Sequence, residues 1–116
     1  MYGLMAPQSP EERKRETVFV YSQGWPPAFK GDLFYYSVDH QMSDGELAAI
    51  DTGRCAVHLL TGEYDWTAPP ALSAAAAEHI PGATFKPMSG LGHFPMCEDP
   101  ERFLDEIRPV LEKIRA

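Results

Sequence analysis

The stretch from Cys55 to Gly62, Cys-Ala-Val-His-Leu-Leu-Thr-Gly, decides the fold class, because it is a nearly unbroken apolar run that ends at a glycine. A short run of this kind predicts a strand buried on both faces of a parallel sheet. Residues 68–82 start with prolines, continue through an alanine-rich middle and end at a proline and a glycine, which predicts a helix. Residues 83–88 predict a second short strand, and residues 99–116 predict a closing amphipathic helix. This order is that of an α/β protein in which two parallel strands carry covering helices.

The chain ahead of the first strand predicts helices. A helix is expected from Ser9 to about Ser22, with the serine hydroxyl as its cap and Pro10 at its first position. Residues 24–42 are rich in aromatic residues and broken by glycine and proline. They predict irregular structure or short helical turns that pack against something larger.

A further short helix is expected between Ser43 and about Gly53. Ser43 and Glu46 have the spacing of a reciprocal capping box, in which each residue binds the backbone amide of the other. We therefore divide the chain into a helical segment, residues 1–53, and an α/β segment, residues 54–116.

Composition and charge narrow the possible partners. The chain has 116 residues, of which 44% are hydrophobic and 23% charged, and this suits one small domain or part of one. The formal net charge of −7 argues against nucleic acid or an anionic membrane as a partner, because both attract basic surfaces. The sequence contains no apolar segment long enough to predict a membrane span, and it shows no signal-peptide pattern. We therefore expect a cytoplasmic protein. Cys55 and Cys97 are expected to be reduced, packed thiols.

Candidate catalytic side chains lie in the two loops that follow the predicted strands. Asp65 follows the first strand, and His93 lies in a glycine-containing loop after the second. Because functional groups of open α/β sheets gather beyond the carboxyl ends of the strands, we expect these two side chains to hydrogen-bond. Such a bond fixes the histidine tautomer and stabilises the protonated ring, which is how a general base is oriented.

Each candidate has alternatives. Asp65 also suits a turn or a helix cap, and Glu63 is a competing acid in the same loop. The other histidines are His58 in the predicted strand, His79 in the predicted helix and His40 in a predicted loop, and structural or solvated roles are favoured for them. No closely spaced set of ligands predicts a metal site, and no glycine-rich loop predicts a phosphate site.

Two segments resemble the C-terminal part of the α/β-hydrolase fold: LLTGEYDWTAPP, residues 59–70, and IPGATFKPMSGLGHFPMCEDPERF, residues 80–103. The resemblance implies that Asp65 is the acid and His93 the general base of a nucleophile, histidine and acid triad. It also implies hydrolysis of an ester or related bond in a small-molecule substrate, without a cofactor. The resemblance covers about residues 55–116, and the helical segment before them looks like part of the lid that such enzymes carry.

We expect the nucleophile of such a triad to be absent from this chain, because the chain contains no nucleophile elbow motif. The elbow motif G-x-S-x-G has glycines four residues apart, and no two of the nine glycines have that spacing. The stretch VYSQG around Ser22 comes nearest, but Val20 stands at its first glycine position and a double proline follows shortly after it. The segment between Ser22 and Asp65 is also too short for the strand and helix units that normally intervene. The chain alone is therefore not expected to hydrolyse a substrate efficiently.

Two other interpretations remain open. In the first, the chain is a non-catalytic binding or self-association module derived from a hydrolase. Two parallel strands then leave an apolar sheet edge, which favours a homodimer or larger assembly. In the second, the chain is a complete small enzyme that uses Ser22 or Cys97 as nucleophile with His93, although the motif around both residues is lacking.

Overall fold

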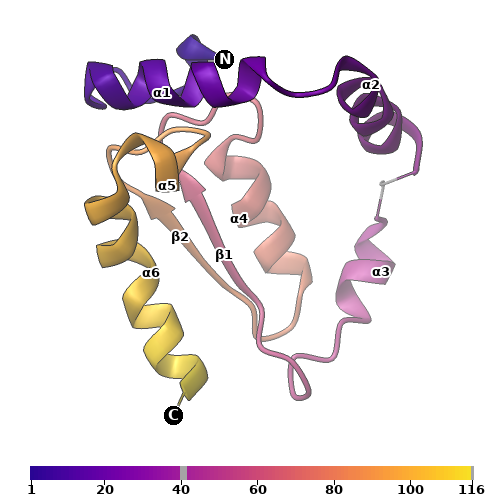
Figure 1. Ribbon diagram of the computed structural model, residues 1–116. Coiled ribbons are helices and arrows are strands. Elements are labelled where there is room, and N and C mark those ends of the chain that lie inside the picture. The colour runs from indigo at the N-terminus through magenta and orange to yellow at the C-terminus, as the bar shows by residue number, and fades with distance from the viewer. Residues whose placement is uncertain (40–41, 116) are drawn as a thin grey trace.

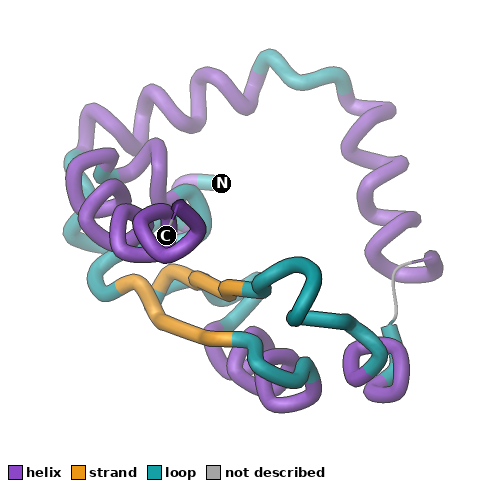
Figure 2. The backbone as a smooth tube through the Cα atoms, turned by 90° about the horizontal axis from the view of Figure 1, so that it is seen from below, coloured by secondary structure: helices purple, strands orange, loops and turns teal. Residues whose placement is uncertain are grey.

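A computed structural model, which describes residues 1–39 and 42–115, is a mixed α/β structure built around two parallel strands (Figure 1). Strand β1 spans His58–Gly62 and strand β2 spans Thr84–Met88, with the first residue of each opposite the other. Helix α4, Pro70–His79, connects the strands, and helix α6, Pro100–Arg115, follows them. The two helices lie on opposite faces of the strand pair (Figure 2). The predicted α/β order of this half is thus confirmed. His40 lies outside the described residues.

The first strand differs from its prediction in start and in burial. It begins at His58, and Cys55 is exposed. Asp51 explains the later start, because its carbonyl accepts the amides of Arg54 and Cys55 and so holds these residues in a turn. Cys97 is also free and exposed, so the expectation of packed thiols is wrong. The strand is only half-buried over its first residues, since no third strand of the described chain flanks it.

Helix α1, Glu11–Ser22, occupies the predicted range and crosses beyond the carboxyl ends of both strands (Figure 1). Its expected start is wrong in detail. Pro10 is the residue before the helix, and Ser9 makes no capping bond. The Ser9 hydroxyl donates instead to the carboxylate of Glu98. Serine is a common helix cap, but the Ser9 hydroxyl binds a residue that is distant in the sequence instead.

The aromatic segment is more regular than predicted. Helix α2 spans Pro26–Phe34 and continues into a π-helical turn, η2, over Tyr35–Asp39. The double proline starts this helix. Proline has no amide hydrogen, and in the first helical turn that hydrogen would have no intrahelical acceptor, so its absence costs nothing there. No residue of α2 is buried, so the expectation that it packs against something larger is wrong for the described chain.

Helix α3, Asp44–Ala48, contains the predicted capping box. The Glu46 amide donates to Ser43 Oγ at 3.3 Å, and the Ser43 amide donates to Glu46 Oε2 at 2.7 Å. The helix ends well before Gly53, because a turn held by Asp51 follows.

The C-terminal helices add one element that was not predicted. Helix α5, Pro95–Glu98, is a single turn directly after His93, and its proline stands at the first position. Helix α6 runs on through Pro109. A short 3₁₀ turn, η1, spans Tyr2–Leu4. Five buried apolar side chains lie where the carboxyl ends of the strands, the N-terminal segment and α5 meet: Met5, Ala6, Met88, Leu91 and Phe94. Ile80 is buried at the other end of the strands, just after α4. Among the described helices, none combines the length and apolar character needed to cross a membrane.

Candidate functional site

The two candidate residues meet at the carboxyl end of the strand pair. Asp65 follows β1 in a turn in which its amide donates to the Gly62 carbonyl at 3.0 Å. The loop after β2 brings His93 to the same edge, and His93 Nδ1 lies 2.8 Å from Asp65 Oδ2. Asp65 is buried, with 7% of its surface exposed, whereas 35% of the His93 side chain is exposed. The hydrogen bond expected from the strand-end rule is therefore present.

The second carboxylate oxygen of Asp65 organises its own turn. Oδ1 accepts the amides of Thr67 and Ala68, each at 3.0 Å, and the Thr67 hydroxyl at 2.8 Å. This is the turn-forming role that was the structural alternative for Asp65. One oxygen builds the turn while the other binds the histidine, so the two interpretations of Asp65 are compatible.

The surroundings of Asp65 favour its charged form. Burial is the largest single influence and raises the pKa, but the Ala68 amide, the His93 ring and the Thr67 hydroxyl together hold the Asp65 pKa below its usual value. An ionised carboxylate can only accept, so the proton of a neutral His93 ring is assigned to Nδ1. The Thr67 hydroxyl donates to Asp65, and its oxygen, 3.0 Å from Nδ1, can accept a share of the same proton. Nε2 is then left with the lone pair that a general base needs.

Glu63, the competing acid, has a different set of partners. Its Oε2 accepts the Gly90 amide at 2.8 Å and the Ser89 hydroxyl at 3.2 Å. Gly90 has a φ of 74°, a conformation that residues with a side chain rarely adopt. Glu63 thus stabilises the tight turn after β2, and within the described chain it makes no bond to His93.

Close backbone packing holds the histidine loop against β1 and against the N-terminal segment. A Cβ added to Gly62 would lie 2.1 Å from the Gly92 carbonyl oxygen, so this approach requires glycine. The His93 amide donates to the Leu4 carbonyl at 2.9 Å, and Trp66 Nε1 donates to the Gly3 carbonyl at 3.0 Å. Residues ahead of α1 therefore form one wall of the site, which the sequence did not indicate.

Sequence reasoning missed two residues that shape the site. Thr67 contacts both members of the Asp65–His93 pair, and its position two residues after an aspartate in a turn was a usable signal. Glu98 is fully buried in α5 and accepts the amides on both sides of His93. No local pattern marks Glu98, because a glutamate beside a helix start is typical of a solvated surface.

The nucleophile candidates and the remaining histidines lie in other environments. Ser22 is exposed at the end of α1, and its hydroxyl donates to the Phe19 carbonyl at 2.7 Å. Neither Ser22 nor Cys97 bonds to His93 within the described chain. His58 Nδ1 lies 2.7 Å from the Thr84 hydroxyl across the strands, and His79 faces Asp44 at 3.7 Å. These contacts agree with structural roles for both histidines.

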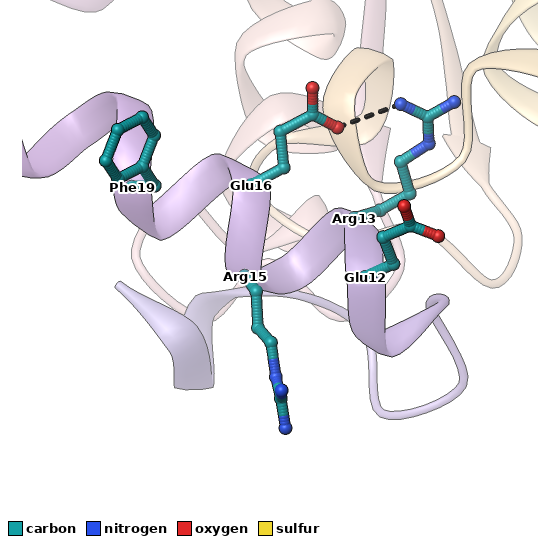
Figure 3. Close-up of a pocket in the computed structure, with 5 residues that line it drawn as sticks. All are labelled: Glu12, Arg13, Arg15, Glu16 and Phe19. Carbon is teal, nitrogen blue, oxygen red and sulfur yellow. Dashed lines mark hydrogen bonds and ion pairs between the residues drawn. The ribbon is translucent and has the colours of Figure 1, made fainter.

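Two surface hollows lie beside α1, and neither is lined by Asp65 or His93. One is lined by α1 residues alone, and Figure 3 shows Arg15 pointing away from the other labelled side chains, while Arg13 pairs with Glu16 at 2.9 Å. A second hollow lies between α1 and the start of the C-terminal helices, beside Met96 and Cys97. Over the described residues, no group of three or more histidine, cysteine or acidic side chains could hold a metal ion.

Comparison of the chain with the models of known protein families, with curated proteins and with solved structures found no match.

Proposed function

We propose that this chain is the C-terminal portion of an α/β-hydrolase that contributes the acid and the general base of the triad. The nucleophile, in this proposal, belongs to a part of the enzyme outside the chain. The bond between Asp65 Oδ2 and His93 Nδ1, 2.8 Å long and beyond the carboxyl ends of two parallel strands, is the observation that carries the proposal. The substrate class is a small molecule with an ester or related bond, and the residues provide the chemistry without a cofactor.

The chemistry assigned to each residue follows from its hydrogen bonds. As the nucleophile attacks the substrate carbonyl, His93 Nε2 takes its proton, and the ring becomes an imidazolium. The buried Asp65 carboxylate, whose pKa is held low despite the opposing effect of burial, stabilises that positive charge through Nδ1. His93 then gives the proton to the leaving group as the bond from the carbonyl carbon to that group breaks. In the second step His93 takes a proton from the water that releases the acyl group from the nucleophile. Residues 1–53, with α1 across the strand ends, serve as part of the lid.

The proposal is tested by extending the chain. We expect the coding sequence immediately upstream to continue in frame into a strand pattern followed by G-x-S-x-G or its cysteine or aspartate counterpart. The extended protein should hydrolyse p-nitrophenyl acetate, and His93→Ala should abolish the reaction. His79→Ala, the same change at an exposed histidine at the far end of α4, serves as a matched control and should keep it. An upstream sequence without such a motif, or hydrolysis that survives His93→Ala, would contradict the proposal.

A second assay addresses the complete small enzyme. The chain by itself should turn over p-nitrophenyl acetate no faster than its His93→Ala variant, because neither Ser22 nor Cys97 is bonded to His93 in the described structure. A rate that is lost in the variant would favour the complete enzyme instead. Ser22→Ala and Cys97→Ala would then identify which side chain attacks.

A self-association module is the second candidate, and the exposure of apolar side chains favours it. Four large apolar residues in or just before helix α2 have more than half of their surface exposed to solvent: Trp25, Phe29, Leu33 and Phe34. Each strand also has an edge that no described strand pairs. Unpaired edges and apolar patches both favour association. We propose a homodimer or larger assembly on these grounds, and a monomeric mass at micromolar concentration in size-exclusion chromatography with light scattering would refute it.

A further inference from the structure

Glu98 is a fully buried carboxylate whose partners are all hydrogen-bond donors. It lies in the single-turn helix α5, directly after the histidine loop. Its Oε2 accepts the Gly92 amide at 2.9 Å, and its Oε1 accepts the Phe94 amide at 2.8 Å. One carboxylate therefore binds the peptide groups on both sides of His93.

The same carboxylate also binds the N-terminal segment. Oε2 accepts the Ala6 amide at 2.9 Å and the Ser9 hydroxyl at 3.0 Å. The His93 amide itself donates to the Leu4 carbonyl at 2.9 Å. All three amides from Gly92 to Phe94 thus have an acceptor, and each acceptor is either Glu98 or a residue of the segment that Glu98 holds.

A glutamate at this position carries a desolvation cost that its hydrogen bonds must offset. A buried carboxylate loses its hydration, and no basic side chain of the described chain forms an ion pair with Glu98 to compensate. The donors that replace water are two backbone amides of the loop that carries His93, together with one amide and one hydroxyl of the N-terminal segment. A rigid backbone on both sides of that residue limits the directions in which its ring can point, as the geometry of a general base requires.

We propose that Glu98 is a positioning residue. It fixes the backbone around His93, so that Nδ1 keeps its hydrogen bond to the Asp65 carboxylate. The inference rests on the proposed function only in giving His93 the role of the base. Glu98 takes no part in proton transfer. Its effect is to fix the orientation of the His93 imidazole ring.

The test is the variant Glu98→Gln, followed by nitrogen-15 NMR of the His93 ring in the chain itself at a pH where the ring is neutral. Glutamine replaces one carboxylate oxygen with an NH₂ group, which can donate a hydrogen bond but cannot accept one. At least one bond to the loop or to the N-terminal segment is therefore lost. The wild-type ring should carry its proton on Nδ1. In the variant, the Nδ1-protonated fraction should fall toward the mixture of an unconstrained imidazole, and the Gly92 and Phe94 amides should exchange about tenfold faster or more.

Glu63→Gln is the matched control. It makes the same chemical change in a carboxylate that binds the amide of Gly90 in the same loop region, and it should leave the His93 tautomer unchanged. If Glu98→Gln does not fold, Glu98→Asp is measured in its place, since it keeps the charge but is one methylene too short to span both amides.

The proposal is overturned if a folded Glu98 variant keeps the wild-type His93 tautomer although its loop amides exchange faster. It is also overturned if Glu63→Gln shifts the tautomer to the same extent. Neither readout involves hydrolysis, so failure of the extended protein to cleave an ester would count against the proposed function and leave the role of Glu98 to be decided by the NMR result.

Discussion

The substitution Asp65→Asn separates the two roles of the Asp65 side chain. Asparagine keeps an oxygen for the Thr67 and Ala68 amides, so the turn retains its main acceptor. The amide group then faces His93 Nδ1, and because it can only donate, Nδ1 must accept. We therefore expect the neutral ring to move its proton to Nε2, which removes the lone pair that a general base needs.

The energetic cost follows from the bonds that change. The bond from His93 to an ionised carboxylate is worth about 1.5–3 kcal/mol, and the neutral bond that replaces it about 0.5–1.5 kcal/mol. Asp65→Asn should thus lower the free energy of unfolding by roughly 1–2 kcal/mol. Asp65→Ala also removes the acceptor of two amides and a hydroxyl, and each unsatisfied group costs about 1–3 kcal/mol. The alanine variant should therefore be less stable than the asparagine variant by roughly 3 kcal/mol or more.

Two measurements check this reasoning. Urea unfolding gives the stability of the three proteins, and nitrogen-15 NMR of the neutral His93 ring gives its tautomer. The reasoning fails if the asparagine variant keeps its proton on Nδ1. Equal destabilisation by asparagine and alanine would show that Oδ1 does not organise the turn.

Other predictions concern close packing and acid stability. Gly92→Ala should destabilise the protein by about 1–3 kcal/mol in urea unfolding, because its Cβ would lie 2.6 Å from the Leu4 carbonyl oxygen. Gly31→Ala in α2, where nothing lies within 4 Å of the added Cβ, should instead leave stability unchanged or raise it by up to about 1 kcal/mol. Asp65 has a lower pKa in the folded than in the unfolded protein, so its contribution is complete above about pH 4 and is lost as the pH falls through the folded-state pKa. Urea unfolding between pH 2 and pH 7 should therefore show a smaller acid dependence in Asp65→Asn than in the wild type.

The sequence predicted those parts of the fold that depend on local pattern. The apolar run that ends at Gly62, the alanine-rich helix and the capping box of Ser43 and Glu46 each contain their own signal within a few residues. Each forms where it was predicted apart from its ends, although the strand is less buried than expected. The hydrogen bond between Asp65 and His93 was also within reach, because parallel strands bring their carboxyl ends to one edge. The catalytic roles of the two residues stay predictions.

What the sequence did not indicate depends on partners that are far apart along the chain. Ser9 has the residue type of a helix cap, but a carboxylate with no sequence relation to it takes the hydroxyl. Helix α2 forms although glycine and proline interrupt its sequence, because the prolines fall in the first turn. Periodicity and turn chemistry describe neighbours, and they do not identify which distant residue fills a buried position.

The bonds that Glu98 makes also bear on the order of folding. The bond from Ala6 to Glu98 joins residues 92 positions apart, whereas Asp65 and His93 are separated by 28. Closing a longer loop costs more chain entropy, and contacts between distant residues form late. We expect β1, α4 and β2 to bring the acid and the base to one sheet edge first. The N-terminal segment then docks in the final step, so a partly folded chain holds both groups near each other before the histidine ring is immobilised.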